Sequence, residues 1–353
     1  MPDWTKAMQQ TFEYYVVDPG TWLDVKRLDC VISSTINRDA ETETLGSLTL
    51  DVLEPISECY IRVYLITIQN GLREKHPLGT YLVQTPSYDF DGKVKSVKLD
   101  AYTPLMELKE KQPPLGYSIL ENENIMERVY AITKDNLRAP VYRVDNDETL
   151  HQDFVANTND TWVTFLSDLA ANAKYSLGLD ELGKVIFMPI QDTASLQPVW
   201  YYSDDNCSIL HPEIEMTQDL YGIPNAVEVI FSTNTKYFYT KVTNDDPNSP
   251  ISTVRRGREI IYRDMNPSGV GNPTQEQLDE YAKRLLRSLS SLEYRVTYTH
   301  AYCPVRLGDC VMLNYARAGL RNIKGKVVSQ SIECVPGCPV TETIVFTNRL
   351  WGD

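Results

Sequence analysis

Four of the seven cysteines lie near the C-terminus with spacings that allow two pairs of thiols to converge. One pair flanks a Pro–Gly corner and the other flanks a Val-Pro-Gly turn; they are Cys303 with Cys310 and Cys334 with Cys338. In a reducing compartment, four thiolates hold Zn²⁺ tetrahedrally or carry an iron–sulfur cluster. Such a metal would be structural, because four thiolates leave zinc no open position. The spacings differ from a standard zinc ribbon, and four small buried apolar side chains are the favoured alternative.

The remaining residues that commonly do chemistry form no catalytic pattern. The sequence has no G-x-S-x-G elbow, no P-loop and no G-x-G-x-x-G motif. No histidine stands with a Ser or Cys in a local setting typical of nucleophilic catalysis, so all four are interpreted as surface or packing residues: His76, His151, His211 and His300. We therefore predict no catalytic residues, no cofactor-binding residues and no enzyme.

Two further clusters have structural interpretations. Asp89-x-Asp91-Gly92 resembles the start of a calcium loop but lacks the Glu at position twelve, so Asp91-Gly92 predicts a hairpin turn instead. The densest basic cluster is Arg255-Arg256-Gly257-Arg258. It has the charge to contact phosphates, but on an acidic chain we expect it to pair with acidic residues of a neighbouring subunit.

The overall charge argues against a protein that grips nucleic acid. The 353 residues contain 34 Lys and Arg against 48 Asp and Glu, a formal net charge of −14, whereas a nucleic-acid site needs clustered positive charge. An acidic surface repels DNA, which suits a protein past which DNA must slide. No apolar run approaches the length of a membrane span. The N-terminus has no secretory pattern, so we expect folding in a cytoplasm.

The clearest structural elements lie between residues 272 and 315. Thr274 and Gln277 are spaced as a capping box, and six apolar residues at helical spacing form one stripe: Leu278, Tyr281, Ala282, Leu285, Leu286 and Leu289. From Glu293 the apolar period changes to two, which predicts a strand directly after the helix. We expect a helix over 274–291 that lies on a sheet and leads directly into one of its strands. Such an arrangement has a structural role and not a catalytic one.

The chain length predicts two or three domains, and three segments differ in pattern. Residues 1–104 contain short alternating strands and turns, typical of a small barrel or sandwich. Residues 105–203 contain helical stripes, the best of them behind an Asn159 or Asp160 cap, and then a strand–turn–strand. Residues 204–353 return to strands. The predicted fold class is mainly β with an α+β insertion.

Several stretches along nearly the whole chain resemble one group of viral proteins in their residue patterns and in the order in which they follow one another. They are TWLDVKRLD (21–29), YIRVYLITIQNG (60–71), HPLGTYLVQTPS (76–87), IPNAVEVIFS (223–232), SPISTVRRGREI (249–260), the helix at 274–289, YCPVRLGDCVMLNY (302–315) and RLW (349–351). In these stretches the chain resembles the baseplate hub of long-tailed bacteriophages. That hub is a trimeric ring that caps the distal end of the tail tube and carries the spike.

The resemblance implies two tail-tube-like β-barrel domains, one in 1–104 and one in 204–353, with the α+β domain between them. It also implies a homotrimer whose six barrels match a six-fold tube. The implied partners are the tail tube protein or tube-initiator ring, the spike or tip protein, the tape measure protein and the baseplate wedge.

The implied location is the virion tail baseplate, assembled in the bacterial host cytoplasm, with DNA passing through only during ejection and no membrane insertion. Two alternatives stay open from the sequence: a tail-associated peptidoglycan hydrolase and a host carbohydrate-binding module.

Overall fold

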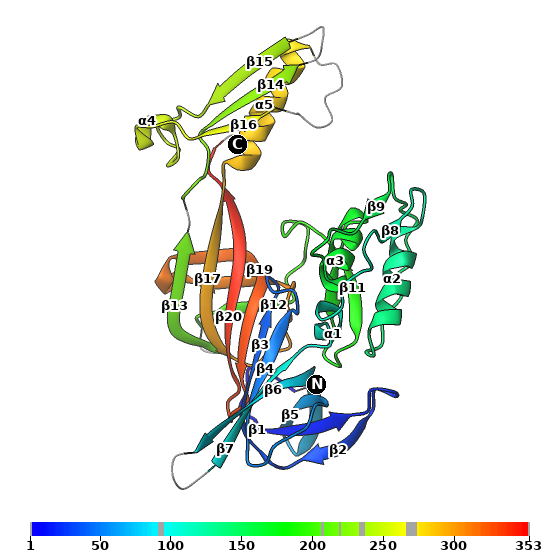
Figure 1. The fold of residues 1–353 in the computed structure, drawn as a ribbon. Helices are drawn as coiled ribbons and strands as arrows, with labels where there is room; N and C mark the ends of the chain where they lie inside the picture. Colours follow the sequence, from blue (N-terminus) through cyan, green and yellow to red (C-terminus); the bar gives the residue numbers. More distant parts are fainter. Residues whose placement is uncertain are drawn as a thin grey trace. The chain divides into compact units, whose positions relative to one another are not determined.

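The computed structural model describes residues 2–90, 95–205, 208–218, 220–232, 237–265 and 274–351 (Figure 1). The chain is mainly β, as predicted, with a smaller helical content. It forms two compact units: unit 1 is Met1–Ile214 with Thr297–Ile344, and unit 2 is Glu215–Val296 with Val345–Asp353. Each unit therefore combines residues that lie far apart in the sequence. Among the described residues, no helix is long and apolar enough to cross a membrane.

The alternating segments between residues 31 and 102 form strands, as predicted, and residues 9–28 add two more. The strands are β1 (Gln9–Val17), β2 (Asp24–Leu28), β3 (Val31–Asp39), β4 (Gly46–Val52), β5 (Tyr60–Gln69), β6 (Leu72–Phe90) and β7 (Lys95–Tyr102). In β4 every second side chain is completely buried, at Leu48, Leu50 and Val52, so one face of the strand lies on the core. The predicted turn at Asp91-Gly92 lies outside the described residues.

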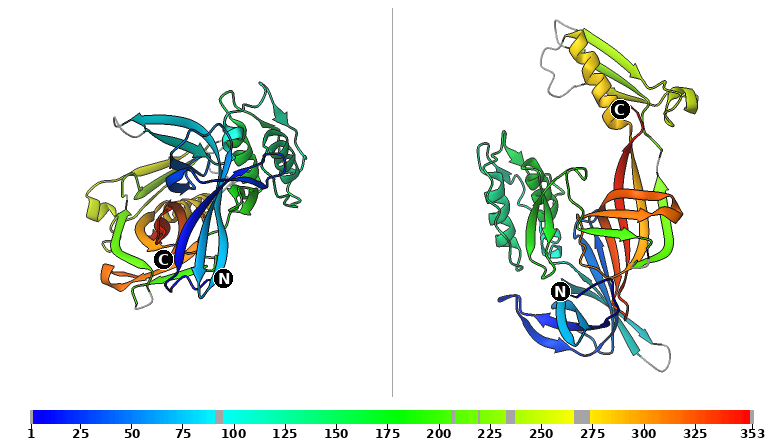
Figure 2. Two further views of the ribbon diagram at one scale, coloured as in Figure 1. Left: turned by 90° about the horizontal axis from the view of Figure 1, so that it is seen from below. Right: turned by 180° about the vertical axis from the view of Figure 1, so that it is seen from behind.

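The C-terminal strands continue the same sheet (Figures 1 and 2). They are β12 (Trp200–Ser203), β13 (Leu210–Gln218), β17 (Ser291–Ala301), β18 (Cys310–Tyr315), β19 (Leu320–Glu333) and β20 (Pro339–Arg349), with a short 3₁₀ turn η1 (Ala316–Ala318) after β18. The strand order is β13-β17-β20-β19-β3-β4-β7-β6-β5-β1-β2, with β18 also paired to β19 and β12 to β18. The link between the two β regions is the antiparallel pair β3–β19, in which Ile36 lies opposite Ile332. The two regions that the sequence separates are thus parts of one hydrogen-bonded sheet.

Residues 105–203 contain the predicted helices and the predicted strand–turn–strand. The elements are α1 (Met106–Lys109), β8 (Ser118–Ile119), α2 (Ile125–Asn136), β9 (Phe154–Val155), α3 (Trp162–Asn172), β10 (Tyr175–Leu179) and β11 (Val185–Pro189). The predicted cap of α3 is wrong by one or two residues, because Thr161 caps the helix. Its hydroxyl accepts from the Thr164 N–H, and the Thr164 hydroxyl accepts from the Thr161 N–H, a reciprocal capping box.

One apolar cluster runs from this insertion into the N-terminal strands. Phe165 and Leu166 of α3 are completely buried in a cluster that also contains Val17 and Tyr60. Trp22 packs edge-to-face on Tyr60, with 4.9 Å between the ring centroids. The predicted boundary at residue 104 therefore does not separate two apolar cores.

The turn between β10 and β11 is tied to the N-terminal strands through one carbonyl oxygen. The oxygen of Leu182 accepts hydrogen bonds from Trp22 Nε1 (2.8 Å), Thr80 Oγ1 (2.8 Å) and Arg62 Nη2 (3.3 Å). Arg62 is itself buried and pairs with Asp24 at 2.8 Å. Because a carbonyl oxygen has only two lone pairs, three donors saturate it and hold the turn in one position.

Unit 2 is a three-stranded sheet with one helix on it. Its elements are β14 (Ala226–Ser232), β15 (Tyr237–Thr243), β16 (Ile261–Asp264), α4 (Thr253–Arg256) and α5 (Gln275–Leu289), and the strand order is β15-β14-β16. The predicted helix over 274–291 is α5, and Thr274 and Gln277 form the predicted capping box. The predicted stripe is confirmed, because Leu278, Ala282 and Leu286 are completely buried against β14.

We expect the substitution Gly183→Ala to lower the free energy of unfolding by about 2–3 kcal/mol. Gly183 has φ +74°, and a Cβ there would lie 2.6 Å from Cβ of Thr80, at the point where the β10–β11 turn meets β6. Urea unfolding followed by tryptophan fluorescence measures the loss. Gly116→Ala is the matched control, since Gly116 has φ +77° but no atom within 4 Å of an added Cβ. Equal losses in the two variants would contradict the close contact at Thr80.

Candidate functional site

The structure separates the four cysteines that the sequence suggested as metal ligands. Cys334 and Cys338 lie in the same buried region, Cys303 contacts the hydroxyl of Tyr202 at 3.2 Å, and Cys310 lies opposite Lys326 in the β18–β19 pair. Within the described ranges, no three or more Cys, His, Asp or Glu side chains are arranged to hold a metal ion. The residues present do not fit a site built from all four thiolates.

The thiols have the surroundings expected of small core side chains. All four are buried. Burial raises the pKa of Cys334 to about 11 and also raises the pKa values of Cys338 and Cys310. Because the thiolate is the reactive form, thiols with raised pKa values are poor nucleophiles. The arrangement favours the packing interpretation of these residues.

A cluster of polar side chains, the Glu342 cluster, is buried inside unit 1. Glu342 of β20 has no exposed surface, and its two oxygens accept hydrogen bonds from the Tyr298 hydroxyl (2.6 Å) and the Gln330 amide (2.7 Å). His300 Nε2 lies 3.7 Å from the second oxygen. Arg38 of β3 donates to the amide oxygen of Gln330 at 3.0 Å. The cluster therefore joins side chains of β3, β17, β19 and β20.

His300 connects this cluster to Cys303. The Tyr202 hydroxyl lies 3.1 Å from His300 Nε2 and 3.2 Å from Cys303 Sγ. His300 Nδ1 lies 2.7 Å from the backbone oxygen of Ala301. Because a backbone oxygen only accepts hydrogen bonds, Nδ1 carries a proton and donates it there.

His300 and Glu342 form a charged pair at neutral pH. Burial opposes the charged imidazole, but the interactions with Cys303 and Glu342 outweigh it and raise the pKa of His300 to about 10. Burial also favours the neutral form of Glu342, but the interactions with His300, Tyr298 and Gln330 hold its pKa below its ordinary value. A buried ion pair is tolerated only where further hydrogen bonds satisfy both partners, and here they do.

Cys303, His300 and Glu342 are the residue types of a cysteine-nucleophile site, and the sequence analysis missed their association. The His300-x-x-Cys303 spacing was a signal, but the acid comes from a distant strand. Their exposed fractions are 1%, 0% and 0%, and neither of two cavities in unit 1 is lined by any of the three. With the thiol enclosed by packed side chains, the cluster acts as a polar core that fixes the strands.

The other histidines also fit the predicted interpretation. His76 is half-buried beside Trp4, with 5.1 Å between the ring centroids, and its Nε2 lies 3.0 Å from the Thr67 hydroxyl. Burial lowers the pKa of His76. His151 and His211 are exposed.

The basic cluster at 255–258 has partners within its own unit. Arg255 Nε donates to the backbone oxygen of Pro247 at 3.0 Å, and Arg256 donates to two backbone oxygens, one of them that of Ile223 at 2.9 Å. Two of the three arginines are thus engaged without a second subunit. Pairing of the cluster with a neighbour's acidic residues stays a prediction.

Unit 2 exposes one face of its sheet. In β15, Phe238 and Val242 pack toward α5, so the alternation of the strand directs Tyr237 and Tyr239 to the opposite face. These two tyrosines are 66% and 43% exposed, and Ile261 of the neighbouring β16 is 36% exposed. A half-covered sheet with exposed rings is a candidate contact surface.

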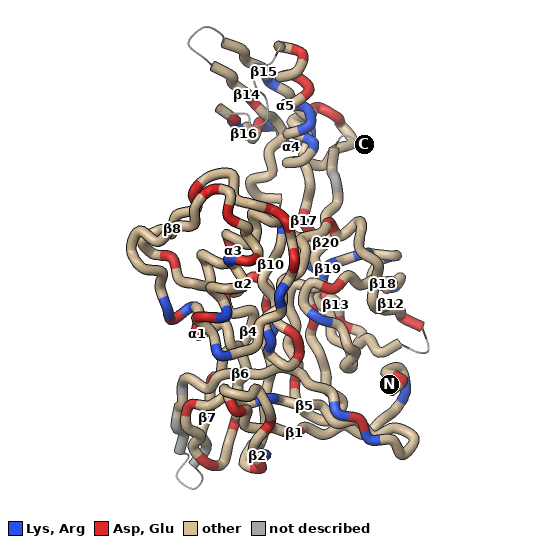
Figure 3. The backbone as a smooth tube through the Cα atoms, turned by 90° about the vertical axis from the view of Figure 1, so that its right-hand side faces the viewer, with Lys and Arg blue, Asp and Glu red and all other residues tan. Residues whose placement is uncertain are grey.

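Unit 1 exposes apolar residues beside an edge strand. β2 ends the main sheet and pairs only with β1 among the described strands. Leu23 and Val25 are 64% and 63% exposed there. Basic and acidic residues are interspersed along the described backbone of each unit (Figure 3). The strand edge offers unpaired backbone groups next to apolar side chains.

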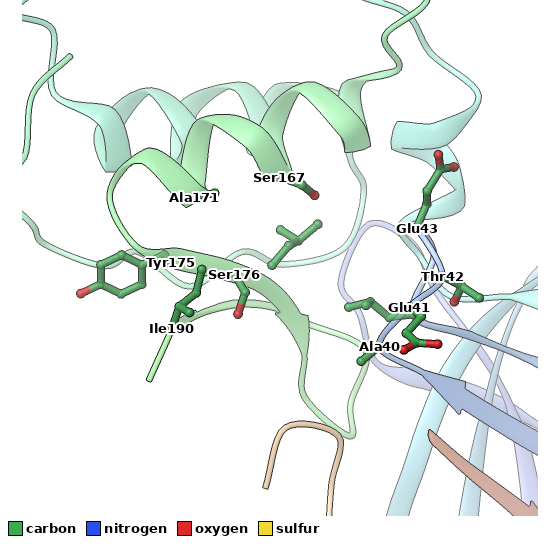
Figure 4. Close-up of a pocket in the computed structure, with 11 residues that line it drawn as sticks. Ala40, Glu41, Thr42, Glu43, Ser167, Ala171, Tyr175, Ser176 and Ile190 are labelled. Atoms are coloured by element: carbon green, nitrogen blue, oxygen red, sulfur yellow. The ribbon is translucent and has the colours of Figure 1, made fainter. Parts of the chain in front are cut away.

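A cavity of about 320 Å³ lies between α3, β10 and the loop 40–43 (Figure 4). Ser167, Ala171 and Tyr175 form much of its wall. Its acidic residues are Glu41 and Glu43, and Glu43 is also within 3.0 Å of an ammonium group on α1. The lining contains no nucleophile with a neighbouring base, so the cavity supports no catalytic assignment.

Comparisons with known proteins reveal a likeness in fold. No family model matches the chain, and no curated protein matches its sequence. A tail protein from Neisseria meningitidis MC58 matches with a TM-score of 0.64 and 11% identity, covering 96% of each chain. The 43 kDa tail protein of prophage MuSo2 from Shewanella oneidensis matches with a TM-score of 0.62 and 12% identity, covering 95% of this chain and 98% of that one.

The prophage tail protein gp18 from Listeria monocytogenes EGD-e matches with a TM-score of 0.51 and 11% identity, covering 96% of this chain and 95% of that one. At these identities the matches show a common fold over nearly the whole chain.

We expect stability to depend on pH through the Glu342 cluster. Because the pKa of His300 rises from 6.5 to about 10 on folding, its contribution is complete below pH 6.5 and is lost as the pH rises to about 10. Because the pKa of Glu342 falls below its ordinary 4.5, its contribution is present above pH 4.5 and is lost as the pH falls through the lowered value. Urea unfolding at a series of pH values should therefore show greatest stability between these limits.

Glu342→Gln tests the origin of this profile. We expect a loss of about 3 kcal/mol at pH 6, because His300 must then either carry a buried charge without its partner or give up its proton on folding. We also expect the decline between pH 6.5 and 10 to become shallower. Glu333→Gln, an exposed acid on neighbouring β19, is the control and should change neither. A Glu342→Gln protein with the wild-type pH profile would rule out the ion pair.

Metal analysis tests the thiolate prediction. We expect the purified protein to contain well below one equivalent of zinc or iron per chain, because the four thiols do not gather around one point. Plasma mass spectrometry of protein purified without chelator gives the content. One equivalent that disappears in both Cys303→Ser and Cys334→Ser proteins would establish the tetrathiolate site and overturn the arrangement described above.

Proposed function

We propose that this chain is a structural virion protein, a homotrimeric baseplate hub that joins a six-fold tail tube to a three-fold spike or tip. The observation that carries the proposal is the similarity of fold, over 96% of the chain, to a protein described as a tail protein. Two further solved structures with the same overall fold are also described as tail proteins. The proposal assigns the chain to the tail baseplate of a virion.

The chemistry of the interior supports an assembly role. The side chains with catalytic potential, Cys303, His300 and Glu342, are enclosed and hold strands together. For the peptidoglycan-hydrolase alternative, neither of the two described cavities contains Cys303, His300 or Glu342. A hub must keep its shape while attached to several partners, and a cross-linked polar core serves this requirement.

The exposed surfaces support binding to other chains. The free edge of β2 with Leu23 and Val25, and the uncovered sheet face with Tyr237 and Tyr239, combine apolar area with polar surroundings. Tyrosine is enriched in protein interfaces because its ring packs while its hydroxyl bonds to water or to a partner. The proposed partners are further copies of this chain, the tail tube protein or initiator ring, the spike, the tape measure protein and the baseplate wedge.

The charge of the chain supports a channel role. With a formal net charge of −14, a ring of three chains would carry three times that charge. A negative channel wall does not bind the DNA backbone, so DNA slides through without being held. In the proposed ring, each chain supplies two tube-like β-barrel domains, and three chains thereby match six-fold symmetry.

We expect the purified chain to form a trimer of about 121 kDa, three times the 40.3 kDa chain, at micromolar concentration. Sedimentation equilibrium measures the mass, and negative-stain images should show rings with three-fold symmetry. Gold-labelled antibodies against the chain should bind at the tip of assembled tails.

Two results would contradict the hub. One is a monomer that binds neither the tube protein nor the spike protein of the same tail. The other is lysis of peptidoglycan at the position of the isolated chain in a zymogram, which would favour the hydrolase. Glycan binding by a monomer on an array of host surface sugars would favour the carbohydrate-binding alternative.

A further inference from the structure

A second cavity of unit 1, of about 340 Å³, is larger and more polar than the one beside α3, and none of the interactions described so far explains it. Most of its wall comes from the β10–β11 hairpin, residues Leu78–Tyr81 of β6 and the corner Arg306–Asp309, and Arg38, Ala40, Leu45 and Thr103 also line it. Lys326 of β19 completes the wall. Its volume is at the lower end of the range typical of small-ligand sites.

Glycines allow neighbouring side chains to lie close to the backbone in this lining. Gly79, Gly178, Gly183 and Gly308 all belong to the lining. A Cβ on Gly79 would lie 2.4 Å from the hydroxyl oxygen of Tyr81. A Cβ on Gly178 would lie 2.8 Å from the terminal methyl group of Met188. The space that a side chain would take at Gly79 and Gly178 is thus filled by the Tyr81 ring and the Met188 methyl group, which give the wall an apolar part.

The charged groups of the lining are satisfied, with one exception. Arg306 pairs with Glu181, and Arg38 donates to Gln330 and to a backbone oxygen. Asp180 accepts two backbone N–H groups. The remaining cation is Lys326, whose ammonium has no hydrogen bond or ion pair with any described residue.

Asp309 is the remaining acidic residue of the lining, and it does not serve as the counter-ion of Lys326. One of its oxygens accepts the Arg306 N–H at 2.8 Å. Burial raises the pKa of Asp309, which weakens it as a counter-ion. The cavity thus combines apolar wall groups with the partly buried residue Lys326, whose ammonium has no anionic partner among the described residues.

We propose that this cavity binds a carboxylate carried on a small apolar group, with Lys326 as the counter-ion and Tyr81 and Met188 as the apolar contacts. The same chemistry is offered by a free aryl or alkyl acid and by an acidic residue next to an aromatic one in a partner's peptide. Lysine binds a carboxylate as a point charge with three donors, so it accepts either source. The inference is independent of the proposed hub role.

The experiment uses the full chain and two probes. 3-Phenylpropionate represents the free acid, and the blocked peptide acetyl-Phe-Glu-amide represents the peptide source. We expect 3-phenylpropionate to bind with a dissociation constant of about 1 mM, as its size allows, and about tenfold tighter than uncharged 3-phenylpropionamide. Ligand-observed NMR titration measures both. Binding of the peptide in place of the free acid would assign the site to a protein partner.

Lys326→Met keeps the length of the side chain and removes its charge, so the preference for the acid over the amide should disappear. Lys324→Met is the matched control on the same strand, because the Lys324 ammonium already donates to Ala194 O at 2.7 Å and lies outside the lining. It should keep the tenfold preference. The proposal is overturned if neither acid binds below about 10 mM, or if Lys326→Met retains the preference while folded by circular dichroism.

Discussion

The side-chain arrangement in much of unit 1 depends on one carboxylate that has no exposed surface. Glu342 is stable inside the protein only while His300, Tyr298 and Gln330 remain in place around it. Arg38 extends the requirement, because it bonds to Gln330 with one nitrogen and to the backbone oxygen of a β6 residue with another. One charge thus links strands from both ends of the sequence, and this explains how a sheet with distant partners keeps a single register.

The sequence was sufficient where the structure depends on neighbours along the chain. The stripe from Leu278 to Leu289 and the Thr274 box predict α5 because helix geometry repeats within a few residues. The strands from β3 to β7 followed from alternation. The pairing of β3 with β19 did not, because pairing partners across a sheet leave no local signal. For the same reason the buried His300, Cys303 and Glu342 were not recognised as one cluster, and the cysteines suggested a metal that their arrangement does not favour.

The interior and the surface of the chain differ in the kinds of residue they contain. Reactive residue types lie inside, where they are hydrogen bonded to each other, and apolar residues that a solitary monomer would be expected to bury lie on the edge strand β2 and on one face of the small sheet. An enzyme shows the reverse distribution, with its polar groups turned toward a cleft. The fold shared with solved tail proteins extends over nearly the whole chain, so it includes these surfaces as well as the interior.

The β3–β19 pair also has a consequence for biosynthesis. Arg38 and Gln330, which bond across this pair, are 292 residues apart. At roughly 5–20 residues per second, a ribosome needs about 15 to 60 s to deliver the second after the first. During that interval one edge of β3 has no strand to pair with, because β19 has not yet been synthesised. An exposed strand edge readily pairs with a strand of another chain. Correct pairing of β3 with β19 therefore competes, during synthesis, with pairing of the same edge to other chains.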